Sequence, residues 1–272
     1  MLAPADAMRE FYLRHRWLRA PVVRLRHRKL HDEDAFVISY PRSGSTWLRF
    51  LLYESLSGEP SEFERVHLSI PAVGKHFDAP RLLPDGGRLI GSHEMFCDGP
   101  RKIVYIVRDP RSIVISQYRL RRRQGVEQRD FQTFVEAFAT GRGNPFGSWA
   151  EHTSYWLSGE SAQRGCLHLV KFEDLRNDPE ASLSAALRFL GTHQNPEAVA
   201  TVVSNNTVEE MQAKEDRAPQ EVFRRAKRHD VRFVNSGLVG GWSSRLTSAQ
   251  KQLIEINARD EMVELGYLPN AV

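Results

Sequence analysis

The sequence predicts an α/β fold in which helices flank a mostly parallel central sheet on both faces, in three layers. Short apolar segments at residues 36–39, 89–92, 102–107 and 167–171 have the length and composition of buried strands. Helical patterns separate these segments, as the crossovers between parallel strands require. The chain has 272 residues, of which 41% are hydrophobic, and this is enough for one sizeable core.

The first strand leads into a turn of small residues that is suited to an anion. The turn reads Arg42-Ser43-Gly44-Ser45-Thr46. Small side chains leave the backbone N–H groups accessible, hydroxyl groups add donors, and the arginine adds positive charge. A helix follows from Trp47 onward, and the positive end of its dipole points at the same place. We therefore expect a phosphate or sulfate group at this turn.

This turn does not match the phosphate loop of nucleoside triphosphatases. That pattern requires Gly, four residues, and then Gly-Lys followed by Ser or Thr. Here Ser39 stands at the position of the first glycine, and Gly44 is followed by Ser45 instead of lysine. The sequence therefore argues against an ATP or GTP site of that type. A tight turn that only starts a helix is the structural alternative.

A second anion site is expected where the strand at 102–107 ends. Arg108, Asp109 and Pro110 stop this strand and start a helix, and Ser116 lies two turns into that helix. An arginine at the carboxyl end of a strand and a serine on the following helix can bind one anion. A surface ion pair between Arg108 and Asp109 is the alternative.

A histidine follows the short strand that lies between these two sites in the sequence. Because a neutral imidazole can accept a proton near neutral pH, His93 is a candidate general base. Glu94 comes next in the sequence and should point the other way, since successive strand residues face opposite sides. The sequence therefore favours His93 alone at the site.

The carboxyl-terminal part predicts a closing helix over residues 247–265. We expect three of its apolar residues to face the core: Leu253, Ile254 and Ile256. No linker rich in Pro, Gly or Ser divides the chain, so we expect residues 35–272 to form a single domain.

Residues 1–34 are expected to form a basic amphipathic extension. The first 31 residues hold eight basic and two acidic residues, a local charge of +6, whereas the whole chain carries +4. Aromatic and apolar residues are interleaved with these charges, and Pro21 interrupts any helix. The segment is expected either to pack on its own domain or, through residues 1–30, to contact an anionic membrane.

Cysteine content and hydropathy favour a cytoplasmic protein, with peripheral membrane contact as the alternative. Cys97 and Cys166 allow at most one disulfide. No segment reaches the roughly 18 consecutive apolar residues of a membrane span, and the amino terminus has no apolar signal core. The histidines and cysteines show no metal-ligand spacing, so we expect no metal, and we expect no nucleic-acid partner.

The first turn resembles the loop of sulfotransferases that use 3′-phosphoadenosine 5′-phosphosulfate (PAPS). The loop of that family usually reads Tyr-Pro-Lys-Ser-Gly-Thr-Thr-Trp, and residues 40–47 read Tyr-Pro-Arg-Ser-Gly-Ser-Thr-Trp. The strand that leads to His93 and the Arg108 segment also follow in the order typical of the family. The resemblance covers residues 35 to about 245. It implies a P-loop-like three-layer fold and a cytosolic-type domain, which we expect to come from a bacterial member.

The resemblance also implies a role for each matching residue. It implies that His93 is the general base, that Arg42 is a catalytic cation beside the leaving phosphate, and that Trp47 stacks on adenine. It implies that Arg108 and Ser116 bind the 3′-phosphate. The residues implied to bind the donor are Arg42, Ser43, Gly44, Ser45, Thr46, Trp47, Arg108, Ser116, Phe172, Asn206, Asn235, Ser236 and Gly237.

Several of these positions depart from the family's pattern. Gly91 stands where a lysine is common, so Arg42 is expected to carry more of the charge near the leaving group. Phe172 replaces a tyrosine, and Asn235 and Ser236 replace an Arg-Lys pair. The cations upstream that could compensate for this pair are Lys227, Arg228 and Arg232.

Together these observations predict an enzyme that transfers a sulfuryl group from PAPS to a hydroxyl or amine of a small-molecule, lipid or glycan acceptor. Two alternatives stay open: a P-loop-type kinase, and a non-catalytic binder of adenosine bisphosphate or anionic lipid. Three aromatic residues are expected near the acceptor: Phe77, Phe96 and Phe146. The sequence does not indicate an oligomeric state.

Overall fold

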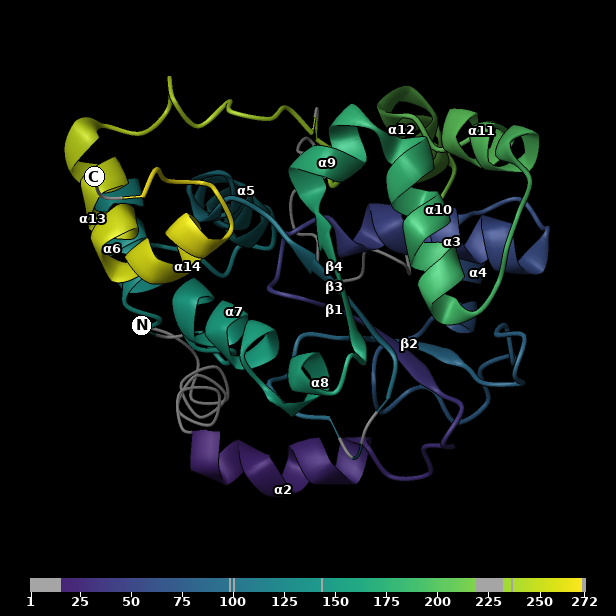
Figure 1. Cartoon of the computed structure of the whole chain (residues 1–272). Helices are drawn as coiled ribbons and strands as arrows, with labels where there is room; N and C mark the ends of the chain where they lie inside the picture. The colour runs from purple at the N-terminus through teal and green to yellow at the C-terminus, as the bar shows by residue number, and fades with distance from the viewer. Residues whose placement is uncertain are drawn as a thin grey trace.

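The computed structural model describes residues 16–97, 99, 101–142, 144–218, 232–235 and 237–270. Its centre is a sheet of four parallel strands in the order β2-β1-β3-β4 (Figure 1). The strands are β1 (Ala35–Ser39), β2 (Leu89–Ser92), β3 (Ile103–Val107) and β4 (Leu167–Lys171). Every residue of β1, β2 and β3 is buried, as expected for a parallel sheet that is covered on both faces. The predicted α/β fold is confirmed.

Helices cover both faces of this sheet, because alternate strand residues belong to different cores. Val37 of β1 packs in the first core, and its neighbours Phe36 and Ile38 pack in the second. The helices of the first core are α3 (Ser45–Ser57), α4 (Phe63–Ser69), α10 (Pro179–Leu190), α11 (Pro196–Ser204) and α12 (Val208–Arg217). Those of the second are α5 (Pro110–Arg123), α6 (Phe131–Ala139), α7 (Trp149–Leu157), α13 (Ser248–Asn257) and α14 (Arg259–Glu264).

Helix α9 (Phe172–Asn177) also belongs to the first core, through Leu175. Two further helices, α2 (Arg16–Arg26) and α8 (Glu160–Gln163), contribute no described residue to the two buried clusters. Helix α2 runs along one side of the molecule, at the bottom of Figure 1. No helix among the described residues is long and apolar enough to cross a membrane.

The strand order determines where a ligand can bind. From β1 the chain crosses to β2 on one side, and then to β3 and β4 on the other side. The loops that follow β1 and β3 therefore run in opposite directions from neighbouring strand ends. Such a switch point opens a crevice at the carboxyl edge of a parallel sheet. The predicted anion sites follow β1 and β3, so the fold brings them to the same edge.

Local sequence signals begin the helices next to this edge. Asp109 caps α5 through a hydrogen bond from the backbone N–H of Arg111, and Pro110 occupies the first turn, where a missing N–H costs nothing. Helix α3 begins after Gly44, whose backbone is left-handed. Each helix thus follows a strand after a short turn, with its amino-terminal end at the carboxyl edge of the sheet.

The predicted closing helix is partly wrong. It is divided at Ala258 into α13 and α14. Ile254 is buried as expected, but Ile256 is 67% exposed. On a helix of 3.6 residues per turn, a residue two positions after a buried one lies about 200° around the axis. Ile256 therefore faces solvent.

Candidate active site

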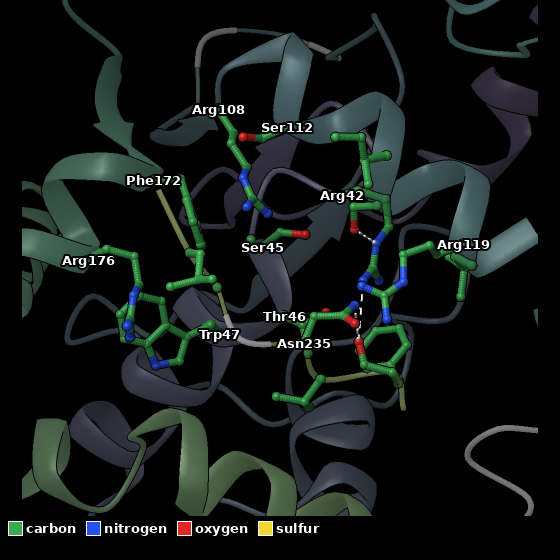
Figure 2. Close-up of a pocket in the computed structure, with 18 of the residues that line it drawn as sticks. Arg42, Ser45, Thr46, Trp47, Arg108, Ser112, Arg119, Phe172, Arg176 and Asn235 are labelled. Atoms are coloured by element: carbon green, nitrogen blue, oxygen red, sulfur yellow. Dashed lines mark hydrogen bonds between the residues drawn. The ribbon is translucent and has the colours of Figure 1, made fainter. Parts of the chain in front are cut away.

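A cavity of about 330 Å³ lies at the carboxyl ends of β1 and β3 (Figure 2). Its walls come from the turn after β1, from Arg108 and α5, from Phe172, and from the carboxyl-terminal segment around Asn235. Five arginines and no acidic residue line it among the residues that the structure describes: Arg42, Arg108, Arg119, Arg176 and Arg245. This charge favours a ligand with several negative charges.

The turn after β1 requires its glycine. The φ angle of Gly44 is 100°, which side chains with a Cβ rarely adopt. A Cβ at this position would also lie 2.4 Å from Cδ2 of Phe172. The turn therefore packs directly against the Phe172 ring, with Ser45 and Thr46 facing the cavity.

Arg42 connects three walls of the cavity. Its Nε donates to Oγ of Ser116 on α5 at 3.0 Å, and a terminal nitrogen donates to the carbonyl oxygen of Phe233 at 3.3 Å. The guanidinium carbon lies 4.7 Å from the centre of the Phe233 ring. Burial lowers the pKa of Arg42 to about 10, and the charge of Arg108 adds to this effect. Arg42 remains a cation at neutral pH and is held in place by α5 and the carboxyl-terminal segment.

In Figure 2, Arg42 lies on one side of the Ser45 hydroxyl and Arg108 lies on the other. The guanidinium carbon of Arg108 lies 4.0 Å from the centre of the Phe172 ring. Its Nε is buried and makes no hydrogen bond with any described residue. Burial lowers the pKa of Arg108, while the charges of Glu173 and Asp109 oppose this shift. Since an unpaired buried donor is costly, an anionic ligand group fits this position.

Trp47 forms the wall beside Phe172. The indole N–H of Trp47 donates to the backbone carbonyl of Asn206 at 2.7 Å, and its ring lies 6.2 Å from that of Phe172. The Arg176 guanidinium lies 5.4 Å from the indole. The side chain of Asn206 instead donates to Glu54 at 2.9 Å, away from Trp47. Asn206 thus contacts Trp47 through its backbone only.

His93 lines the same cavity and is held by the end of β1. Its Nδ1 lies 2.7 Å from the carbonyl oxygen of Ser39, so Nδ1–H donates and Nε2 keeps its lone pair. Burial lowers the pKa of His93, and the positive charge of nearby Arg49 lowers it further. The hydrogen bond to the Ser39 carbonyl opposes this shift. The imidazole is therefore neutral near pH 7. As expected, Glu94 points elsewhere and pairs with Arg19 at 2.9 Å.

The structure brings most of the predicted site residues to one cavity. Those that line it are Arg42, Gly44, Ser45, Thr46, Trp47, His93, Arg108, Ser116, Phe172, Asn206, Asn235 and Gly237. Ser43 does not line it, because its side chain is buried and its N–H donates to the carbonyl oxygen of Tyr40 at 3.2 Å. Ser236 lies outside the described residues.

Of the three upstream cations that could compensate for the missing Arg-Lys pair, the structure describes only Arg232. Arg232 forms an ion pair with Asp216 at 3.0 Å and is absent from the cavity walls. Lys227 and Arg228 lie outside the described residues. Of these cations, Arg232 therefore does not reach the cavity.

Sequence reasoning missed Arg119, which also lines the cavity. Ser112, Ser116 and Arg119 follow at positions i, i+4 and i+7 of α5, so they share one face of the helix. This helical spacing is the sequence signal that could have indicated Arg119. Arg119 makes no hydrogen bond or ion pair with any residue that the structure describes, and its charge contributes to the lowered pKa of Arg42.

Comparison with known proteins agrees with this geometry. A family model described as "Sulfotransferase domain" matches residues 32–266. Sulfotransferase 1A1 of Bos taurus is 27% identical over 251 residues, which cover 85% of this chain and 83% of that protein. Sulfotransferase 2A6 of Mus musculus is 24% identical over 268 residues, covering 93% of this chain and 92% of that protein.

A similar fold is found in a crystal structure of retinol dehydratase in complex with retinol and adenosine 3′,5′-bisphosphate (PAP). The TM-score is 0.69 at 18% identity, and the match covers 86% of this chain and 82% of that chain. No group of three or more His, Cys, Asp or Glu side chains within the described ranges could hold a metal ion. Since the sulfotransferase match covers most of its length, this chain belongs to the sulfotransferase family and is a PAPS-dependent sulfotransferase.

Proposed function

We propose that the protein transfers the sulfuryl group to a hydroxyl, and that His93 is the general base. One observation carries this assignment: Nδ1–H of His93 donates to the Ser39 carbonyl at 2.7 Å, which leaves the Nε2 lone pair available at the cavity. The lowered pKa of His93 keeps this nitrogen unprotonated near neutral pH. Such a base typically contributes about 10²–10⁴-fold in rate.

In this proposal, different groups accept the proton of the acceptor hydroxyl and stabilise the negative charge of the leaving phosphate. Nε2 of His93 takes the hydroxyl proton while the acceptor oxygen bonds to sulfur and the bond from sulfur to the phosphate oxygen breaks. Negative charge then grows on the phosphate, where Arg42 and the loop N–H groups stabilise it. Because transfer of this kind is loose and in line, positioning and fixed charge supply most of the catalysis. An amine acceptor would use the same geometry.

The donor site follows from the same assignment. We assign the 5′ end of PAPS to the turn with Gly44, Ser45 and Thr46, and the 3′-phosphate to Arg108 and Ser116. The partnerless Nε of Arg108 supports this placement. Trp47 and Phe172 would then receive the adenine, together with the backbone of Asn206. Asn235, Ser236 and Gly237 would close the site from the carboxyl-terminal segment.

A small apolar alcohol or phenol is the acceptor that we propose. The retinol bound to the dehydratase of similar fold supports this class, and so does Phe146, whose ring lies 5.6 Å from the His93 ring. Phe77 and Phe96 pack instead against Arg28 and His27. Lipid and glycan acceptors are the alternatives to this class.

The test is the variant His93→Ala with PAPS as donor and 4-nitrophenol, retinol and androsterone as acceptors. We expect turnover to fall at least about 100-fold while the Kd for PAP stays unchanged. His67→Ala, on α4 and away from the cavity, is the control and should keep its turnover. Unchanged turnover in His93→Ala would reject the base. No turnover of any of the three acceptors by the wild type would reject the proposed acceptor class.

We also propose that residues 1–34 are an extension of one domain, 35–272, and that residues 1–30 touch an anionic membrane on the cytoplasmic side. Helix α2 exposes Val22 and Leu25, which are 40% and 55% exposed, next to exposed Arg24 and Arg28. Apolar and basic residues on one surface helix favour anionic lipid. Co-sedimentation with phosphatidylserine vesicles tests this, and equal binding to neutral phosphatidylcholine vesicles would reject it.

A further inference from the structure

Helix α2 is attached to the segment that follows the base. One terminal nitrogen of Arg19 lies 2.9 Å from both carboxylate oxygens of Glu94, and Arg26 lies 3.6 Å from one of them. Arg19 and Glu94 are 7% and 5% exposed. Since Glu94 directly follows His93, this buried ion pair links α2 to the end of β2.

The same arginine also contacts the segment of Pro145 and Phe146, whose phenyl ring meets the base. Its other terminal nitrogen donates to the carbonyl oxygen of Pro145, and its guanidinium carbon lies 5.3 Å from the centre of the Phe146 ring. The Phe146 ring in turn meets the His93 ring edge to face, with centroids 5.6 Å apart and planes at 62°. Arg19 is therefore the shared neighbour of Glu94 and Phe146.

We propose that Arg19 is a positioning residue that holds Phe146 against His93, so that the amino-terminal helix builds one wall of the acceptor site. Arg19 touches neither the donor cavity nor the base. Its effect passes through Glu94 on one side and through Pro145 and Phe146 on the other. The proposal rests on the assignment of His93 as base and adds the element that orients an acceptor beside it.

A purely structural ion pair is the competing explanation, and paired replacements separate the two. Removing one partner of a buried pair leaves an uncompensated charge, whereas replacing both partners with apolar residues of similar size is often neutral or stabilising. Arg19→Met alone should therefore lower Tm. The double variant Arg19→Met, Glu94→Met should recover Tm but still lacks the hydrogen bond to Pro145.

The first readout needs no acceptor. In the NMR spectrum, the ring current of the Phe146 side chain shifts the resonance of the carbon-bound imidazole protons of His93. This resonance is assigned to His93 by its absence from the spectrum of His93→Ala. We expect the double variant to shift this resonance in the direction seen in Phe146→Leu, with the Kd for PAP unchanged. Arg24→Ala, at an exposed position of the same helix, is the control and should leave the resonance in place.

The second readout is acceptor kinetics with 4-nitrophenol, retinol and androsterone. The kcat/KM of the double variant should fall about 10- to 100-fold, because displacing reacting groups by about 1 Å costs on this order. A wild-type His93 resonance or a wild-type kcat/KM in the double variant at recovered Tm would overturn the proposal. Failure of the base assignment is a different result, since His93→Ala would then stay active while the resonance still reports on Phe146.

Discussion

Positive charge in the donor cavity is distributed over several elements. Arg42 comes from the turn after β1, Arg108 from the end of β3, and Arg119 from the second half of α5. Asn235 carries no charge, so at this position the carboxyl-terminal segment contributes an amide to the cavity and no cation. Arg119 lacks any acidic partner among the described residues and lines the same cavity as Asn235. It is the arginine best placed to supply the missing charge.

Arg119→Ala is therefore expected to weaken PAP binding. Losing one charge-assisted hydrogen bond costs about 1.5–3 kcal/mol, which corresponds to a Kd roughly 10- to 100-fold higher by calorimetry. Arg232→Ala is the matched control: its ion pair with Asp216 is exposed, and its loss should change the Kd less than about 2-fold. Equal effects of the two variants would contradict the role of Arg119.

For single residues, the position within the order of motifs predicts a site residue better than the residue type does. Arg42 and Arg108 could be predicted because they lie one to three residues after a strand, and parallel strands end at one edge of the sheet. The helical spacing places Arg119 on the face of Ser116, but it does not rank Arg119 above Arg232, since both are arginines near a predicted site. The choice depends on Asp216, which pairs with Arg232 only after the chain folds.

Helix α3 has a left-handed glycine at each end, and the two positions differ in their surroundings. Gly44 has a φ of 100° and would place a Cβ 2.4 Å from Phe172, whereas Gly58 has a φ of 71° and open space around it. Both glycines allow the chain to turn sharply at an end of the helix. Only Gly44 also lets the turn approach a cavity wall.

The two glycine variants should therefore separate backbone strain from site geometry. Gly58→Ala is expected to lower the free energy of unfolding by about 1–2 kcal/mol and to leave PAP binding unchanged. Gly44→Ala adds overpacking of about 1–3 kcal/mol and should raise the Kd for PAP at least about 10-fold as the loop moves. Urea unfolding and calorimetry measure both effects. Wild-type PAP affinity in Gly44→Ala would show that Phe172 yields to the added methyl group.

Elements were predictable where a short pattern is unambiguous. The strand at 103–107 is a continuous apolar run that ends at Arg108 and a helix-starting proline. The inward face of the last helix was not predictable from such a pattern, because Leu253, Ile254 and Ile256 cannot all face the core on one helix. Its contact with α6 buries Ile254 and leaves Ile256 in solvent.

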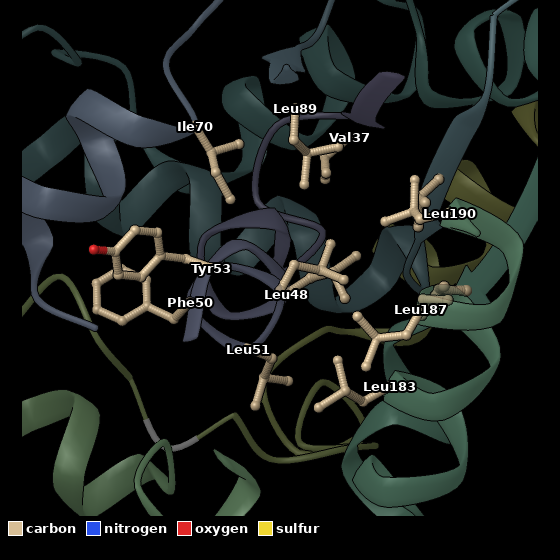
Figure 3. Packing of buried hydrophobic residues seen from close by; sticks show 14 of the residues in the cluster. Val37, Leu48, Phe50, Leu51, Tyr53, Ile70, Leu89, Leu183, Leu187 and Leu190 are labelled. Carbon is tan, nitrogen blue, oxygen red and sulfur yellow. The ribbon is translucent and has the colours of Figure 1, made fainter. Parts of the chain in front are cut away.

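On the scale of the whole molecule, two cores hold the sheet and its carboxyl edge in place. Figure 3 shows the first core, where Leu48 of α3 lies between the sheet residue Val37 and Leu187 of α10. The apolar segments predict that such a core exists. They do not predict the strand order, because four similar apolar strands can pair in several ways. Local sequence does not encode which strands become neighbours.

The second core contains a buried histidine that links the site to global stability. His152 is fully buried; its Nδ1 lies 3.0 Å from the Tyr105 hydroxyl, and its Nε2 lies 3.2 Å from the carbonyl oxygen of His93. Burial lowers the pKa of His152 to about 3, with the charge of His93 as the second cause. The folded protein therefore keeps this imidazole neutral in mild acid.

Stability should fall as the pH drops below about 6.5, where His152 in the unfolded chain binds a proton that the folded chain does not. Between pH 6.5 and 5 this residue alone should cost the folded state about 2 kcal/mol. His152→Gln keeps an amide for Tyr105 and the His93 carbonyl but does not titrate. The difference in free energy of unfolding between wild type and variant, measured in urea, should therefore narrow by that amount over the same pH range. Parallel curves would mean that His152 is protonated equally in both states, which its burial beneath the His93 carbonyl argues against.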